Sequence, residues 1–233
     1  MTEDFDNFDE HADNYRSVHN KNLRFLGSDS AYFTRYKADL LKRFEADGEL
    51  KLLDIGCGDG LAEIRMKENF PQWKINGIEV SARFIQQCRD LHLENVEFDV
   101  YDGKTIPFPD ASFDIVFIAT VLHHIAESSH TALIQEISRV LKKGGRVYIF
   151  EHNPLNPLTQ YLVATCEFDK DAVLLRKKYL GKLLKQEGFR ISYQGYMTFV
   201  PPKKIFSFLV PIEKYLTWLP LGGQYFLGAV KKG

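Results

Sequence analysis

The glycine-rich segment at residues 52–60 has the clearest chemistry in the sequence. It reads Leu-Leu-Asp-Ile-Gly-Cys-Gly-Asp-Gly, which predicts a strand that runs into a tight turn and then a helix. Glycines at such a turn allow positive φ and let a ligand approach the main chain closely. A tight turn that binds nothing has the same pattern, so the interpretation depends on the residues around it.

Two acidic residues indicate what the turn would hold. Glu79 lies 23 residues after Gly56, at the end of the next predicted strand, and an acid at about this spacing accepts hydrogen bonds from ribose hydroxyls in dinucleotide sites, where the spacing is about 20 residues. Asp54 precedes the glycines, where a carboxylate repels pyrophosphate but suits an ammonium or sulfonium group. The spacing G-x-G-x-G also differs from the dinucleotide pattern G-x-G-x-x-G. These features favour S-adenosylmethionine over a dinucleotide.

Two pairs of titratable residues, His123-His124 and Glu151-His152, follow the predicted fourth and fifth strands. A histidine with a pKa near neutrality is the usual group that removes a proton from a hydroxyl acceptor. We expect His124, and then His152, as the catalytic base, with at most one member of each pair facing the site because adjacent side chains at a strand end diverge. A helix-capping or packing role near Ile125 is the alternative for either histidine.

From about residue 50 onward, short apolar runs alternate with segments of helical period, a pattern typical of parallel strands joined by crossover helices. Ser81 is expected to cap the helix after the second strand. The segment Lys142-Lys143-Gly144-Gly145 is expected to end the helix before the fifth strand. The Asn-Pro steps at 153–157 predict turns, although Asn153 and Asn156 could instead orient a polar acceptor. The strands are predicted at 50–55, 73–80, 95–100, 113–119, 146–151, 189–196 and 224–230.

Two segments do not follow this alternation, one at the start of the chain and one between the last two strands. Ligands of open α/β sheets bind beyond the carboxyl ends of the strands, so we expect both segments to cover that edge. The chain is thus predicted to be one domain over 1–233. It would have a helical cover at 1–48, a cofactor-binding core at 49–152 and a C-terminal part at 153–233 that carries a lid-like insertion at 203–221.

The composition argues against several classes of protein. The 30 basic and 31 acidic residues give a net charge of -1, so no long-range field attracts phosphate backbones or anionic lipid. Cys57, Cys88 and Cys166 are few, distant and without zinc-type spacing, which suits a reduced cytoplasmic protein. The acidic N-terminus differs from a secretion signal, and charged residues and prolines interrupt the apolar run at 205–221. We expect a cytoplasmic protein without metal, nucleic-acid partner or stable membrane association.

Several stretches between residues 50 and 152 match the motifs of one known family. They are the glycine loop, Gly77-Ile-Glu-Val-Ser81, Asp102-Gly103 with Ile106-Pro-Phe108 and Ser112-Phe-Asp114, Leu122-His-His-Ile125, and Leu141-Lys-Lys-Gly-Gly145. Together these stretches resemble the class I S-adenosylmethionine-dependent methyltransferases of the small-molecule type. The resemblance implies an α/β fold with a Rossmann-like, seven-stranded, mostly parallel sheet, helices on both faces, an antiparallel last strand and an N-terminal helical cover.

The resemblance implies one group of cofactor contacts around the glycine loop. Gly56 and Gly58 would lie against the methionyl part and the ribose, with Cys57 between them as a small filler rather than a nucleophile. Asp54 would lie near the ammonium group. Glu79 would bind the ribose diol, unless it is merely a solvated strand end.

A second group of implied contacts comes from the other strand ends and the N-terminus. Val80 would pack on the adenine, and Asp102 would accept from its amino group with a main-chain contact from Gly103, although Asp102 could be only a loop carboxylate. Ala119 and Thr120 would lie beneath the sulfonium. The Ala12-Asp-Asn-Tyr15 stretch resembles an element that closes over the cofactor through Tyr15.

We therefore expect a methyltransferase that moves the methyl group of S-adenosylmethionine to oxygen or nitrogen of a small-molecule acceptor and leaves S-adenosylhomocysteine. Displacement at a sulfonium chiefly requires alignment and exclusion of water, so a base is optional. One alternative is an RNA or protein methyltransferase, which a strongly basic patch would favour. Another is a non-catalytic S-adenosylmethionine-binding module. A weaker idea is a peripheral membrane role for residues 205–221.

Overall fold

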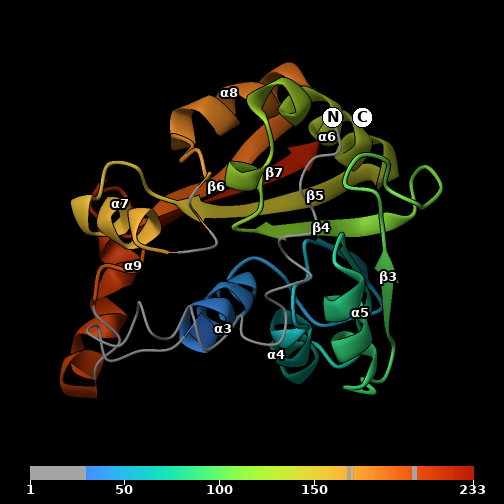
Figure 1. Cartoon of the computed structure of the whole chain (residues 1–233), viewed down its shortest axis with the longest axis horizontal. Helices are drawn as coiled ribbons and strands as arrows, with labels where there is room; N and C mark the ends of the chain where they lie inside the picture. Colours follow the sequence, from blue (N-terminus) through green and yellow to red (C-terminus); the bar gives the residue numbers. More distant parts are fainter. Residues whose placement is uncertain (1–29, 167–168, 170, 201–203) are drawn as a thin grey trace.

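The computed structural model describes residues 30–166, 169, 171–200 and 204–233. They form three layers, with a seven-stranded sheet between two layers of helices (Figure 1). Helices α3, α4 and α5 cover one face, and α6 and α8 cover the other. The helices are α3 Ser30–Leu41, α4 Leu61–Asn69, α5 Ala82–Arg89, α6 Glu127–Val140, α7 Pro157–Ala164, α8 Lys177–Gln186 and α9 Glu213–Leu216, with 3-10 helices η2 Leu122–His124 and η4 Lys204–Ile212.

The sheet has the order β3-β2-β1-β4-β5-β7-β6. Strands β1 to β5 run parallel, and β7 is antiparallel to both of its neighbours. The predicted fold class is therefore confirmed. The order reverses between β1 and β4, so a crevice for ligands is expected at their carboxyl ends. The strands are β1 Lys51–Ile55, β2 Lys74–Glu79, β3 Val96–Val100, β4 Phe113–Ala119, β5 Leu141–His152, β6 Phe189–Met197 and β7 Gln224–Lys231.

The central strands are apolar on both faces, as a sheet covered by two helical layers requires. Along β4, Val116 and Ile118 face the layer of α6 and α8, whereas Ile115 and Phe117 face the layer of α3 and α4. Side chains of a strand alternate between faces, so Asp54 shares its face with Leu52, on the side of α3 and α4. The position of Asp54 in β1 therefore directs a carboxylate toward these two helices.

Helix α5 forms as the sequence predicts. The Ser81 side chain accepts a hydrogen bond from the Phe84 N–H at 3.2 Å, and Phe84, Ile85 and Cys88 are buried on one face. Helix α3 packs on α4, where Asp39 pairs with Arg65 at 2.7 Å and accepts from Asn69 at 2.8 Å. None of the helices described here has both the length and the apolar composition that crossing a bilayer requires.

Two predicted boundaries near β5 are wrong. Helix α6 ends at Val140 and β5 begins at Leu141 rather than at Arg146, because Lys142 extends along β4 and its Nζ binds both carboxylate oxygens of Asp114 at 2.8 and 2.9 Å. The basic pair is therefore in the strand and not in the last turn of the helix. A register shift between Phe113 and Ile115 accommodates this extension.

The Asn-Pro segment begins a helix that the sequence did not predict. Asn156 caps α7 by accepting from the Thr159 N–H at 3.1 Å, with proline in the first turn. Asn153 is buried and donates to the carbonyls of Pro220 and Gly222 at 3.1 and 2.8 Å. Both asparagines thus connect α7 to the loop before β7, and turn chemistry accounts for them.

Candidate functional site

The glycine loop follows β1 and is hydrogen-bonded to β2, because the N–H groups of Gly56 and Cys57 donate to the Ile78 carbonyl at 2.8 and 3.2 Å. Gly56, Gly58 and Gly60 have φ of 77°, 54° and 77°, values that L side chains rarely adopt. A methyl group on Gly56 would lie 2.4 Å from Val121 Cγ2, whereas one on Gly58 would meet nothing within 4 Å. Gly56 therefore allows the loop to pack on the end of β4, and Gly58 faces open space.

Glu79 is held at the rim of this loop. Its carboxylate accepts from the Gly58 N–H at 3.2 Å and from the Val80 N–H at 2.7 Å. Glu79 and Val80 are half-buried. Glu79 is thus an ordered group beside the glycine main chain rather than a freely solvated strand end.

A buried pair of carboxyl groups lies beneath the loop. Asp54 Oδ1 and both carboxylate oxygens of Glu63, in the first turn of α4, are buried without hydrogen-bond partners among the described residues. Burial raises the pKa of Asp54 to about 7, with Glu63 and Lys37 opposing this rise and Glu79 adding to it. Burial and the nearby Asp54 raise the pKa of Glu63 as well. An unpartnered buried acid suits a cationic ligand, so the ammonium group of the predicted cofactor fits at Asp54.

The Cys57 side chain points away from this opening. It packs with Ile85, Cys88 and Phe98 in a small core beneath the loop, while Cys88 Sγ donates to the Gly58 carbonyl at 3.1 Å. Hydrogen bonding with Cys88, together with burial, raises the pKa of the Cys57 thiol. Cys57 is thus the expected filler, and only its main chain faces the loop.

Asp102 and Gly103 lie in the turn after β3. Asp102 Oδ1 accepts from the N–H groups of Lys104 and Thr105 at 2.8 and 2.7 Å, and these bonds lower the pKa of the Asp102 carboxyl. Gly103 adopts a φ of 74°. Oδ1 of Asp102 therefore stabilises the turn, as the loop interpretation expects.

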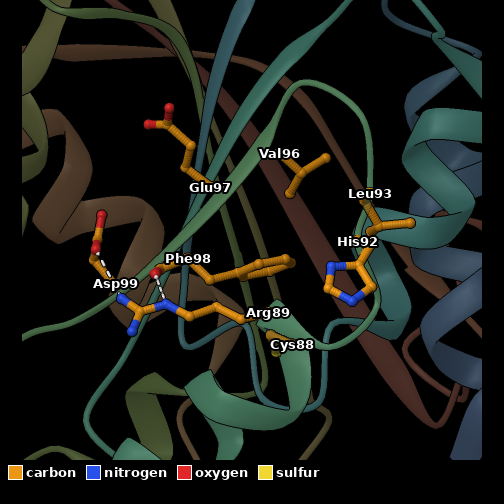
Figure 2. A pocket seen from close by; sticks show the side chains of 8 residues that line it. All are labelled: Cys88, Arg89, His92, Leu93, Val96, Glu97, Phe98 and Asp99. Carbon is orange, nitrogen blue, oxygen red and sulfur yellow. Dashed lines mark hydrogen bonds and ion pairs between the residues drawn. The ribbon is translucent and has the colours of Figure 1, made fainter.

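A separate cavity of about 440 Å³ lies beside the start of β3 and the end of α5 (Figure 2). Arg89 spans it, with Nε donating to the Phe98 carbonyl at 3.0 Å and a terminal nitrogen 3.2 Å from Asp99. None of the predicted site residues lines this cavity. This cavity is therefore not part of the candidate site.

Backbone strain marks the end of β4. Ala119 and Thr120 are half-buried, and Thr120 has a φ of 58°, which is an outlier for a β-branched residue. Its N–H donates to the Phe150 carbonyl at 2.8 Å, and its hydroxyl donates to the Ala119 carbonyl at 2.6 Å. The same hydroxyl oxygen accepts from Lys37 Nζ at 3.3 Å. The neighbouring elements therefore hold this strained turn in place.

Lys37 is the site residue that sequence reasoning missed most clearly. It comes from α3 and is only 4% exposed. Burial lowers its pKa to about 8, opposed by the charges of Glu151 and Asp54. A signal was present, because Lys37 shares its helix face with the apolar Leu40 and Leu41, three and four residues later.

Glu151 organises the turn after β4. Its fully buried carboxylate accepts from the N–H groups of Val121 and Leu122 at 3.1 and 2.8 Å and lies 2.6 Å from His123 Nδ1. On the other side of this ring, His123 Nε2 lies 3.6 Å from Asp169 Oδ1, in the segment between α7 and α8. The buried imidazole of His123 thus lies between two carboxylates.

The side chains of His123 and His124 do not diverge as the position at a strand end predicts. His124 Nε2 lies 3.4 Å from the same Asp169 oxygen, because both histidines belong to the 3-10 turn η2 rather than to an extended strand end. His152 also joins the cluster, with its ring centroid 5.2 Å from that of His123. The structure therefore brings both predicted catalytic histidines together, and it adds His123, Glu151 and Asp169.

Charges set different protonation states within this cluster. Burial lowers the pKa of His123, but Glu151 and Asp169 outweigh burial and raise the pKa to about 9. Burial and the His123 charge lower the pKa of His152 to about 3, which makes it a weak base. His124 keeps 24% of its side chain exposed, so a ligand can reach it.

The ligand atoms of His123, His124 and Asp169 lie within 4.8 Å of one another, a spacing that a metal ion could bridge. A protonated His123 between two carboxylates accounts for the same arrangement. We therefore assign no metal here.

Tyr15, which was predicted to close over the cofactor, lies outside the described residues.

The two glycines allow a matched test of the loop. Gly56→Ala should lower the free energy of unfolding by about 2–5 kcal/mol, because positive φ and the contact with Val121 both oppose the added methyl group. Gly58→Ala should cost only about 1–2 kcal/mol, from φ alone. Urea unfolding measures both variants, and equal losses would contradict the described packing of the loop.

The His123 cation predicts a dependence of stability on pH. A raised folded-state pKa contributes stability that is fully present below the unfolded value of 6.5 and is lost as pH rises through about 9. Between these limits, wild-type stability should fall relative to His123→Gln by on the order of 3 kcal/mol. Urea unfolding across this pH range measures the difference, with the exposed His92→Gln as control. Parallel curves for wild type and His123→Gln would argue against a buried cation.

Comparisons with known proteins agree with this geometry. A family model described as a methyltransferase domain matches residues 52–145. The 27-O-demethylrifamycin SV methyltransferase of Amycolatopsis mediterranei is 36% identical over 102 residues, which are 42% of this chain and 36% of that protein. Phosphoethanolamine N-methyltransferase 1 of Arabidopsis thaliana is 32% identical over 144 residues, 60% of this chain and 28% of that protein. The chain thus spans about a third of the length of these two relatives.

Among solved structures, the putative methyltransferase in complex with the Haloferax volcanii Trm112 methyltransferase activator superimposes with a TM-score of 0.70 at 17% identity. The superposition covers 97% of this chain and 98% of that one. At this identity the likeness concerns the fold alone. Together the comparisons show that residues 52–145 match a methyltransferase domain and that the chain shares the fold of that solved structure.

Proposed function

We propose that the protein transfers the methyl group of S-adenosylmethionine to oxygen or nitrogen of a small-molecule acceptor. The observation that carries the proposal is the glycine main chain between two acids. One is Asp54, whose buried Oδ1 has no hydrogen-bond partner among the described residues, and the other is the anchored carboxylate of Glu79. Two acids beside an open main chain suit a ligand with a cationic end and a ribose diol. Two relatives support the choice of atom, since their names specify an oxygen of a rifamycin and the nitrogen of phosphoethanolamine, whereas the names of the demethylmenaquinone methyltransferases specify no atom.

In this proposal the residues at each strand end bind a different part of the cofactor. Gly56, Cys57 and Gly58 present their main chain to the methionyl part and ribose, and Glu79 binds the ribose hydroxyls. Val80, Asp102 and Gly103 contact the adenine. Ala119 and Thr120 form the floor near the reacting methyl group. When bound, S-adenosylmethionine supplies an electrophilic methyl group on a sulfonium. A contact from Tyr15 remains a prediction.

The acceptor would lie at the histidine cluster after β4 and β5. His124 is the reachable member and we propose it as the base that takes the acceptor proton, with Asp169 orienting its ring and stabilising the imidazolium. The half-buried His152, which its pKa of about 3 keeps neutral, and the His123 cation lie in the same cluster. Glu151 keeps both histidines of η2 in position through the turn that it binds.

We further propose a single domain in which the C-terminal insertion acts as a lid. The hydroxyl of Tyr36 in α3 donates to Glu213 of α9 at 2.7 Å, and the same carboxylate accepts from the Val200 N–H at 2.7 Å. These contacts connect the N-terminal cover to the insertion.

We also propose a cytoplasmic location, which the free, buried state of all three cysteines supports.

Isotope-labelled S-adenosylmethionine tests the proposed function in an extract of the source cells. The purified protein should move label into a small-molecule fraction that gains the mass of one methylene unit. Glu79→Gln should reduce the rate at low cofactor concentration by about 10- to 100-fold, because a charge-assisted bond to the ribose is lost. Glu97→Gln, an exposed acid on β3 that binds Asn76, is the matched control. Label in RNA or protein, or no transfer, would contradict the proposal.

A further inference from the structure

Exposed apolar side chains gather at one end of the molecule. Among the described residues, eight of the eleven large hydrophobic side chains that are exposed belong to two stretches, residues 155–161 around α7 and residues 208–221 from η4 to the loop before β7. They are Leu155, Leu158, Tyr161, Phe208, Ile212, Tyr215, Trp218 and Leu221. Single exposed apolar residues are ordinary, but a group of this size indicates a surface that binds a partner.

The two stretches lie side by side. Asn156, at the start of α7, donates to the Leu221 carbonyl at 2.6 Å, and Asn153 donates to the Pro220 carbonyl at 3.1 Å. Figure 1 shows α7 and α9 together at the end of the molecule opposite β3. The eight side chains therefore belong to one region of the protein surface, which we call the apolar surface.

A buried acid explains why this surface faces outward. Glu213, at the start of α9, is only 2% exposed because its carboxylate accepts a hydrogen bond from Tyr36 in α3. Tyr215 follows two residues later, which is the opposite side of an α-helix. Phe208 and Ile212 precede Tyr215 by seven and three residues, a spacing that places side chains on one side of a helical segment. An amphipathic segment usually buries its apolar side, whereas here the acid faces the protein and the apolar residues face outward.

The apolar surface carries almost no charge. Residues 154–165 include no acidic or basic residue, and residues 208–223 include one acid, the buried Glu213, and one base, Lys214. Lys214 is exposed, and its Nζ lies 4.9 Å from the centre of the Tyr215 ring. A surface that faces only water normally carries many charges of both signs. The two stretches thus present apolar groups and one cation, and none of their acids is exposed to repel the anionic headgroups of lipids.

The residue types suit the boundary between water and lipid. Trp and Tyr are enriched at that boundary, because one end of each side chain is apolar and the other can stay hydrated. Trp218 and Tyr215 are 74% and 68% exposed, and Phe208 is 71% exposed. Lys214 can keep its ammonium group among the headgroups while its stem lies on apolar atoms. Neither stretch contains Arg or Met, which protein interfaces favour. A lipid bilayer therefore fits this surface better than a protein partner.

We propose that the apolar surface binds reversibly to a phospholipid bilayer, with the side chains of Phe208, Tyr215 and Trp218 inserted among the lipids. None of the described helices is long and apolar enough to cross a membrane, so the protein lies on the bilayer rather than in it. The composition of the whole chain favours no membrane association, because it averages over surfaces that differ. The fold brings together apolar residues that the sequence separates into two stretches.

Tryptophan fluorescence tests this proposal without a variant, because the chain has two tryptophans, of which Trp73 is fully buried and Trp218 is exposed. Mixed phosphatidylcholine and phosphatidylglycerol vesicles, added to the full-length protein, should shift the emission to shorter wavelengths. Vesicles with brominated acyl chains should quench it, since an inserted ring reaches the acyl boundary. An absence of both effects, together with an absence of co-sedimentation, would overturn the proposal.

A charge at the apolar surface should weaken this binding. Phe208→Glu should lower the partition coefficient into the same vesicles about tenfold or more, because an acid replaces an inserted ring. Val100→Glu is the matched control, since Val100 is an exposed apolar residue at the end of β3, on the opposite side of the molecule, and it should bind as the wild type does. Thermal unfolding of Phe208→Glu should match that of the wild type, because the Phe208 side chain is mostly exposed.

Two further results would contradict insertion. Binding that disappears at high salt would indicate adsorption through surface charge, which salt screens. A dimer that light scattering detects without vesicles, and that Phe208→Glu separates, would assign the surface to a second copy of the chain. Vesicle binding requires neither cofactor nor acceptor, so its failure is distinct from a failure of the proposed methyl transfer.

Discussion

The buried carboxylate of Glu151 joins the ends of β4 and β5, and the candidate site depends on that junction. It satisfies two N–H groups of the turn after β4 and one ring nitrogen of His123. The Glu151 carboxylate is stable in the interior only while these hydrogen-bond donors stay in place. The turn is thereby fixed, and with it the strained Thr120 and the two histidines that face Asp169. Parallel pairing of β4 and β5 brings these groups together from distant parts of the chain.

Charge is balanced locally in this protein rather than across its surface. The net charge of -1 indicates little about the site, where Asp54 and Glu79 lie beside the glycine loop and the buried Lys37 bonds Thr120 at the end of β4. A cationic, sulfonium-bearing cofactor suits the two acids, and a pyrophosphate does not.

Local patterns in the sequence predicted the core well. The apolar run at 113–119 is β4, Ser81 is a helix cap, and the glycine segment is a turn of positive φ as its residue types indicate. The missed features depend on long-range contacts. Asp169 and Lys37 lie far in sequence from the histidines and Thr120, and β5 starts early because Lys142 reaches Asp114 on its neighbour. Periodicity carries no information about such pairs.

A crystal structure of the protein with S-adenosylhomocysteine tests the central claim most directly, which is that the carboxyl ends of β1 to β4 bind this cofactor between charged side chains. The account predicts the ribose hydroxyls on Glu79, the adenine beside Val80 and Asp102, and the ammonium group at Asp54. A nucleoside bound elsewhere, such as in the cavity near Arg89 (Figure 2), or an ammonium group far from Asp54, would contradict it.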